Sequence, residues 1–347
     1  MSDLAVRDGR VPWRGRLGTE SVPAAEAPDA RRALQLGLAG IWLLDALLQY
    51  QQVMFTRAFG QMLAATAPGN PGVIARPITW DATLIEHYAV ALNAVFATVQ
   101  LLLGLGIAFR PLTRFALAAS VAWSLAVWWL GEGLGGVLNG TANPATGAPG
   151  AVILYALLAV LLWPADRAGP AGAVPDGTVP DGTVPDGTAE AAPFTAARAV
   201  GARAARWLWL VLWLSLAWFA LQPANRAPLA LHDLTARLAD GEPRWLAGIE
   251  NGAAAVVGSH GLAVSIALAA ACVIVAAGVW LPRPAARATL VLALLVAAAI
   301  WVVGEAFGMI LAGGATDPNS GPLLVLLALA YWPAKQGQAR AERAASC

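Results

Sequence analysis

The sequence predicts an all-α integral membrane protein with eight transmembrane helices, arranged as two parallel four-helix repeats. Three observations lead to this prediction. The chain is 58% hydrophobic and only 12% charged, with a mean hydropathy of +0.62, whereas about 25% of the residues of a soluble domain are charged. Long apolar stretches recur along the chain, as spanning helices require. The second half also repeats the first at a nearly constant spacing.

The eight apolar stretches are the candidates for spanning helices. They cover residues 33–50, 87–109, 115–130, 150–163, 205–221, 260–281, 288–303 and 321–332. The fourth and the eighth are short, so we expect them to be tilted or only partly exposed to lipid. The stretches 51–65 and 226–249 have apolar residues near helical spacing. They are predicted to form amphipathic helices at the outer interface.

The repeat is clearest at the end of the third predicted helix of each half. Residues 128–132, WWLGE, recur as residues 301–305, WVVGE, 173 positions later. Each half then reaches a Trp-Pro-Ala sequence, at residues 163–165 and 332–334. Self-similarity over this length indicates one architectural unit that is used twice.

These patterns divide the chain into five segments. They are an N-terminal tail at 1–32, a first four-helix repeat at 33–165, a linker at 166–203, a second four-helix repeat at 204–334 and a C-terminal tail at 335–347. The linker contains VPDGT three times in tandem, from Val174 to Thr188. This turn-forming tract has no apolar face, so we predict that the linker is disordered.

The arginines favour one side of the predicted bundle. They cluster before the first and fifth helices and in the turns that follow the second and sixth. By the positive-inside rule, both termini and the linker are expected to be cytoplasmic, in a multi-pass protein of a bacterial-type plasma membrane. Because each repeat has four helices, both repeats enter from the same side and are therefore parallel.

Four ionisable residues are shared by the two halves. His87 and His260 lie 173 positions apart and open the second helix of each repeat, while Glu132 and Glu305, also 173 apart, close the third. Since the second helix runs inward and the third outward, all four are expected near the outer face. Imidazole and carboxylate ligands together suit zinc, iron or manganese, so these four would be the ligands of any metal site. The alternatives are a site that binds a ligand such as a quinone, and polar anchors that bond headgroups or loop backbone.

Asp45 is a separate candidate in the outer half of the first predicted helix. It is not duplicated, because the second half has Trp218 at that position. A charged carboxylate would cost a few kcal/mol in lipid. It is therefore a functional ligand-binding residue, a buried hydrogen-bonded acid, or an acid at the level of the membrane interface.

Several classes of site and partner are not supported by the sequence. Cys272 and Cys347 are not part of any CxxC or paired spacing, which argues against c-type haem attachment and a thiolate metal site. The net charge of +1 gives no reason to expect nucleic-acid binding.

Two segments of the first repeat carry a family resemblance. Residues 34–49 read LQLGLAGIWLLDALLQ, and residues 101–120 read LLLGLGIAFRPLTRFALAAS, with Gly104, Thr113 and Arg114 around the inner turn. This pattern resembles the DoxX-like membrane proteins. The resemblance implies a four-helix bundle associated with membrane redox chemistry, including subunits of thiosulfate:quinone oxidoreductase.

The residues and the resemblance together predict a quinone-linked or redox-partner subunit with an extracytoplasmic polar site. In such a protein Glu132 and Glu305 would bind or position a ligand or a proton. The cofactor stays open, and quinone is one possibility. The expected partners are the lipid bilayer and a redox protein in the membrane or outside it. The alternatives are a transporter for a small solute or metal ion and a non-catalytic membrane scaffold, and whether the protein is an enzyme stays open.

Overall fold

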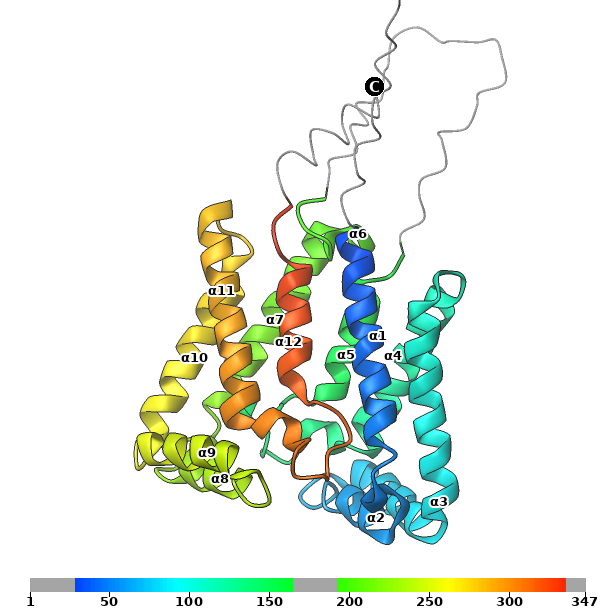
Figure 1. The fold of residues 1–347 in the computed structure, drawn as a ribbon. Helices are drawn as coiled ribbons and strands as arrows, with labels where there is room; N and C mark the ends of the chain where they lie inside the picture. Colours follow the sequence, from blue (N-terminus) through cyan, green and yellow to red (C-terminus); the bar gives the residue numbers. More distant parts are fainter. Residues whose placement is uncertain (1–28, 165–191, 335–347) are drawn as a thin grey trace, which may run out of the picture.

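The computed structural model describes residues 29–164 and 192–334. Over these residues the chain is helical, and extended backbone pairs only in an isolated antiparallel bridge between Phe194 and Pro333. The long helices run side by side, and short helices lie across one end of the bundle (Figure 1). The all-α prediction is confirmed for the described residues. The predicted VPDGT tract, from Val174 to Thr188, lies outside them.

The first half of the chain forms a row of helices. They are α1 (Ala30–Leu48), α2 (Arg57–Ala64), α3 (Gly72–Ala108), α4 (Thr113–Leu130) and α5 (Ala151–Leu161). Helix α3 contacts α1 and α4, and α4 contacts α5. Helix α3 begins earlier than the predicted stretch 87–109 and kinks at Tyr88, whose backbone leaves the helical region. Before the kink, Ile85 packs on Met54 and Phe59, which buries the apolar face of α2.

The second half forms a similar row. Its helices are α6 (Ala197–Val200), α7 (Ala202–Ala220), α8 (Ala230–Leu238), α9 (Arg244–Val257), α10 (Gly261–Gly278), α11 (Arg283–Ala299) and α12 (Ser320–Ala330). Helix α10 contacts α7 and α11, and α11 contacts α12. A π-helical turn, Ile300–Gly304, extends α11. Helices α2, α8 and α9 lie at the end of the bundle opposite the start of α1 and the end of α12 (Figure 1).

Several of these helices have the length and composition of membrane spans. Among the described residues, four qualify, and they are Gly72–Ala108, Arg110–Leu130, Gly261–Gly278 and Arg283–Gly304. Helices α5 and α12 are apolar but shorter. The spanning candidates carry outward-facing apolar side chains, such as Leu102 on α3 with 61% exposure, and these suit contact with lipid tails. The chain is therefore built as a multi-pass membrane protein.

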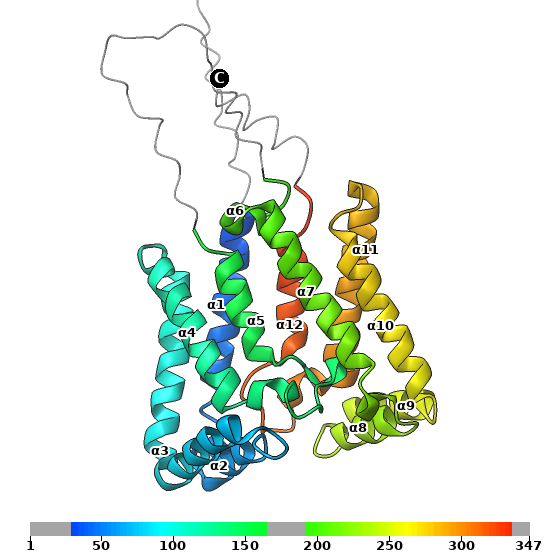
Figure 2. The same ribbon diagram turned by 180° about the vertical axis from the view of Figure 1, so that it is seen from behind.

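The core is shared by the two halves of the chain. Helix α12 contacts both α5 and α1, and these helices lie near the middle of the molecule (Figure 2). One buried cluster joins Trp42 and Tyr155, whose ring centroids are 4.4 Å apart, to Trp209 and Tyr331, at 4.6 Å. Aromatic pairs at such distances add to the stabilisation from burial. The two halves therefore form one packed unit.

The end of the predicted linker is packed on the bundle. Phe194 is 5% exposed and stacks on Tyr331, with ring centroids 5.0 Å apart. Helix α6 follows it and contacts α5. At the other predicted boundary, α1 already begins at Ala30, and Asp29 caps it by accepting a hydrogen bond from the Arg31 amide. Ordered structure thus includes residues 29–32 and 192–203, which the sequence assigned to a tail and a linker.

We expect the substitution Leu158→Ala to destabilise the protein by about 2–5 kcal/mol, because it leaves a cavity in a fully buried cluster. The matched control is Leu102→Ala, whose side chain is 61% exposed. Thermal unfolding in detergent, followed by circular dichroism, compares the two. Equal melting temperatures for the two variants would contradict the position of Leu158 in a shared core.

Candidate functional site

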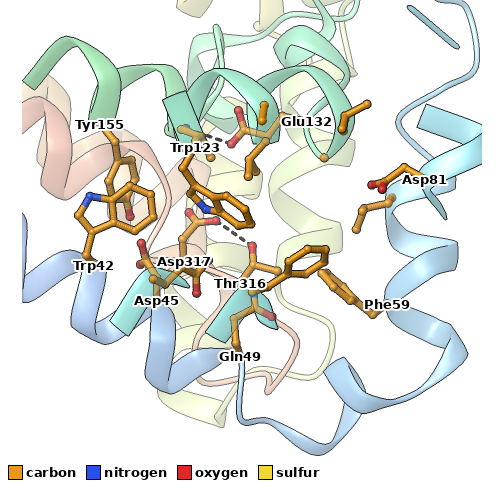
Figure 3. Close-up of a pocket in the computed structure, with 18 residues that line it drawn as sticks. Trp42, Asp45, Gln49, Phe59, Asp81, Trp123, Glu132, Tyr155, Thr316 and Asp317 are labelled. Atoms are coloured by element: carbon orange, nitrogen blue, oxygen red, sulfur yellow. Dashed lines mark hydrogen bonds between the residues drawn. The ribbon is translucent and has the colours of Figure 1, made fainter. Parts of the chain in front are cut away.

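A cavity of about 220 Å³ lies at the end of the bundle that carries α2. Residues of α1 to α5 line it, together with the loop that precedes α12. Its aromatic walls are formed by Trp42, Phe59, Phe96, Trp123 and Tyr155. Figure 3 shows Trp42 and Tyr155 across the cavity from Phe59. A pocket with such walls and a few polar groups is typical of a small-molecule site.

Four carboxylates also line this cavity, and they are Asp45, Asp81, Glu132 and Asp317. Among the described residues, no lysine, arginine or histidine contributes to its lining. Asp45 lies in the last turn of α1 and is 2% exposed. It lies near enough to Asp317 for the two charges to interact. The cavity is therefore strongly acidic for its size.

Glu132 enters the cavity from the turn after α4. Its Oε1 accepts a hydrogen bond of 3.1 Å from the Val152 amide in the first turn of α5. The exposed amides at a helix start favour a negative charge. Burial nevertheless dominates and raises the pKa of Glu132 to about 8, with a further contribution from the charge of Asp317.

Asp317 reaches the cavity from the second half of the chain. Its Oδ1 accepts a hydrogen bond of 2.7 Å from the Asn319 amide, and its Oδ2 accepts one of 2.8 Å from Thr316 Oγ1. The loop is tied to the first half because Gln51 Nε2 donates to the Ala315 carbonyl at 2.9 Å. Burial raises the pKa of Asp317. The site is thus assembled from both halves.

The Tyr155 hydroxyl and Asp45 are placed to interact with each other through their side chains. Four other polar atoms of the lining residues are buried without a hydrogen-bond partner, and three of them are acceptors, namely Gln49 Oε1, Gln100 Oε1 and Glu132 Oε2, whereas one, Trp123 Nε1, is a donor. The carboxylates can only accept while they are ionised. Buried polar groups normally have a partner. The excess of acceptors therefore favours a ligand that is rich in hydrogen-bond donors.

Glu305 lies in a neighbouring cavity, also of about 220 Å³, that Asp317 lines as well. Its Oε1 accepts hydrogen bonds from the Ser320 hydroxyl and from the Ser320 amide, and its Oε2 accepts one of 3.1 Å from the Gly321 amide. Both oxygens are thus paired at the start of α12. Burial outweighs these bonds and raises the pKa of Glu305 to about 7.

The two histidines that the sequence repeat singled out, His87 and His260, are exposed and line neither of these cavities. His87 Nδ1 lies 2.7 Å from the Thr83 carbonyl, and His260 Nδ1 lies 3.3 Å from the Val257 carbonyl. Within residues 29–164 and 192–334, no group of three or more His, Cys, Asp or Glu side chains is placed to hold a metal ion. The structure therefore brings Glu132 together with Asp45, and leaves the histidines apart from them.

Asp317, Asp81 and Tyr155 line the cavity but were not predicted from the sequence. A signal for Asp317 exists, because the Asp317-Pro dipeptide matches Asn143-Pro in the loop of the first half. The local geometry agrees, since Asn143 Oδ1 accepts from the amide two residues later, as Asp317 does. A carboxylate in place of an amide marks a difference between the halves. Asp81 and Tyr155 have no comparable signal, because only the folded chain brings them to the cavity.

Protein-family models, curated proteins and solved structures contain no match to this chain. The DoxX-like resemblance therefore stays a prediction.

We expect the protein to lose stability as the pH rises from about 4.5 to about 8. The pKa values of Glu132 and Glu305 are higher in the folded chain than the ordinary value, so their protons stabilise the folded state. That contribution is complete below the ordinary pKa and is lost as the pH passes through the folded values. With the double substitution Glu132→Gln and Glu305→Gln, the melting temperature should fall less steeply as the pH rises.

The control for this experiment is Asp233→Asn, because the Asp233 side chain is 58% exposed. It should keep the wild-type dependence on pH. If the double variant also keeps the full dependence, the two glutamates do not hold their protons as described.

Proposed function

We propose that this membrane protein binds a small organic cation in the cavity lined by Asp45, Glu132 and Asp317. One observation supports the proposal most directly. Four carboxylates line the cavity, and none of the basic side chains in the part of the chain that the structure describes does so. A bound cation would stabilise the ionised form of these carboxyl groups and supply donors to the unpaired acceptors. It would also be attracted to the faces of Trp42 and Trp123.

The proposed architecture is a pair of parallel four-helix repeats with eight membrane spans. The order of contacts supports it, because α1, α3, α4 and α5 follow one another as α7, α10, α11 and α12 do. The kink at Tyr88 and the start of α10 at Gly261 are separated by 173 positions, the spacing of the sequence repeat. Helices α5 and α12 would then be short spans in the middle of the bundle.

The proposed orientation has both termini in the cytoplasm and the cavity at the outer face of the plasma membrane. It is supported by the positive-inside rule. The turns after α3 and α10 contain Arg110 and Arg283, and α1 begins with Arg31 and Arg32. A cation site at the outer end of a multi-pass bundle suits the first step of solute transport. Among the predicted functions, these features therefore favour the small-solute transporter.

We expect the purified protein in lipid nanodiscs to bind tetramethylammonium saturably, as measured by isothermal titration calorimetry. Replacing two of the carboxylates, by Asp45→Asn and Asp317→Asn together, should weaken binding by about tenfold or more, which corresponds to about 1.4 kcal/mol. Asp233→Asn is the control, because its exposed carboxylate lies outside the cavity. Acetate should not bind.

Either of two outcomes would contradict this proposal. The first is that the wild-type protein does not bind tetramethylammonium, and the second is that the double variant binds it as tightly as Asp233→Asn does. The first outcome would favour the non-catalytic scaffold.

The second candidate function is the quinone-linked redox role that the DoxX-like resemblance implies. A specific observation favours it, because Trp123 Nε1 is a buried donor without a partner on an aromatic wall. A quinone ring can stack on such a wall while its carbonyl oxygen accepts from the indole. Glu132, with a pKa of about 8, could exchange a proton with the quinol.

We expect that, if this second function holds, menadione quenches the tryptophan fluorescence of the protein saturably. Trp123→Phe keeps an aromatic ring but removes the donor, so it should weaken binding by about fivefold, the value of one hydrogen bond of about 1 kcal/mol. Trp207→Phe is the control, because Trp207 is 56% exposed and lies outside the cavity. Equal affinities of the two variants would contradict the role of Trp123.

A further inference from the structure

A third cavity, of about 340 Å³, adjoins the one lined by Asp45, Glu132 and Asp317, which we call the aromatic cavity. It lies in the loop between α4 and α5, and we call it the loop cavity. Its polar lining includes Thr141, Asn143 and Thr146. Thr141 and Thr146 are exposed, whereas Asn143 is buried. The loop cavity therefore reaches from the surface of the protein into its interior.

The two cavities meet at carboxylates. Glu132 and Asp317 line both of them, together with Gly131. The charges of Glu132 and Asp317 are close enough to interact. Glu132 Oε1 is held by α5, but its Oε2 is buried and has no partner. One unpaired carboxylate oxygen thus lies at the boundary between the two spaces.

Two glycines let the backbone approach polar side chains near this boundary without a side chain of their own in the way. A Cβ at Gly150 would lie 2.2 Å from Glu132 Oε2, and one at Gly147 would lie 2.3 Å from Asn319 Oδ1. Both glycines also have positive φ values, of 118° and 88°, which side chains disfavour. Any other residue at Gly150 would crowd Glu132, and any other residue at Gly147 would crowd Asn319 and Glu305.

We propose that the loop cavity is the entrance by which a small organic cation reaches the aromatic cavity, with the carboxyl groups of Glu132 and Asp317 lining the passage between the two. This inference rests on the cation binding proposed above. When its carboxyl groups are ionised, such a passage concentrates cations and speeds their association, while it repels anions. The exposed rim at Thr146 gives the route an opening to water, which a charged solute needs because the lipid side offers it no hydration.

The test is to obstruct the loop cavity with a covalent group at its rim. Thr146→Cys is made in a background in which Cys272 and Cys347 are replaced by alanine, and the thiol is alkylated with N-ethylmaleimide. Association of tetramethylammonium is followed by stopped-flow tryptophan fluorescence, before and after alkylation of the same sample. We expect alkylation to slow association on the order of tenfold.

The control is Thr79→Cys in the same background, because Thr79 is exposed on α3 and lines none of the three cavities. Its alkylation should leave the association rate unchanged. If alkylated Thr146→Cys associates as fast as its unmodified form, the entrance lies elsewhere and this inference is overturned, while the cation site stands. If the wild-type protein binds no tetramethylammonium, both proposals are overturned.

Discussion

The hydrogen bonds between two glutamates and the first turns of α5 and α12 hold the site together. Each of these helices has 11 residues, which span roughly 16 Å at about 1.5 Å per residue, about half of a hydrocarbon core of roughly 30 Å. Their starts therefore lie inside the bundle, where free amides would be costly. Glu132 accepts from the Val152 amide, and Glu305 accepts from the Ser320 and Gly321 amides.

The short helices also explain why cavities exist at this end of the molecule. Ahead of the first turns of α5 and α12, loops fill the remaining depth of the bundle, and loops pack less regularly than helices. The turn after Glu132 contains Leu134 with a positive φ, and the turn after Glu305 contains Phe307 with the same feature. Non-glycine residues in that region store strain of about 1–3 kcal/mol each, and such strain is common at functional sites.

Much of the helical framework could be predicted, because apolar stretches of spanning length are a strong signal. The short fourth and eighth stretches were recognised, and they correspond to α5 and α12. The site was harder to predict. Glu132 was found because it recurs in the second half, and Asp45 because it is a charge within an apolar stretch, but Asp317 joins them only because its loop crosses to the other half of the chain. The shared spacing of His87 and His260 gave no information on which way the side chains face, and both are exposed.

The halves of the chain differ at the positions that matter for the site. Asp45 corresponds to Trp218, and Asn143 corresponds to Asp317. If the two halves are repeats of one unit, as proposed, a symmetric dimer of identical units could not carry different residues at these positions, since every substitution would appear in both copies. Joining the units in one chain removes that constraint. One unit can then specialise in binding a ligand, while the other packs against it and contributes a single acidic loop. Fusion of two copies of a gene allows selection to act on each unit separately.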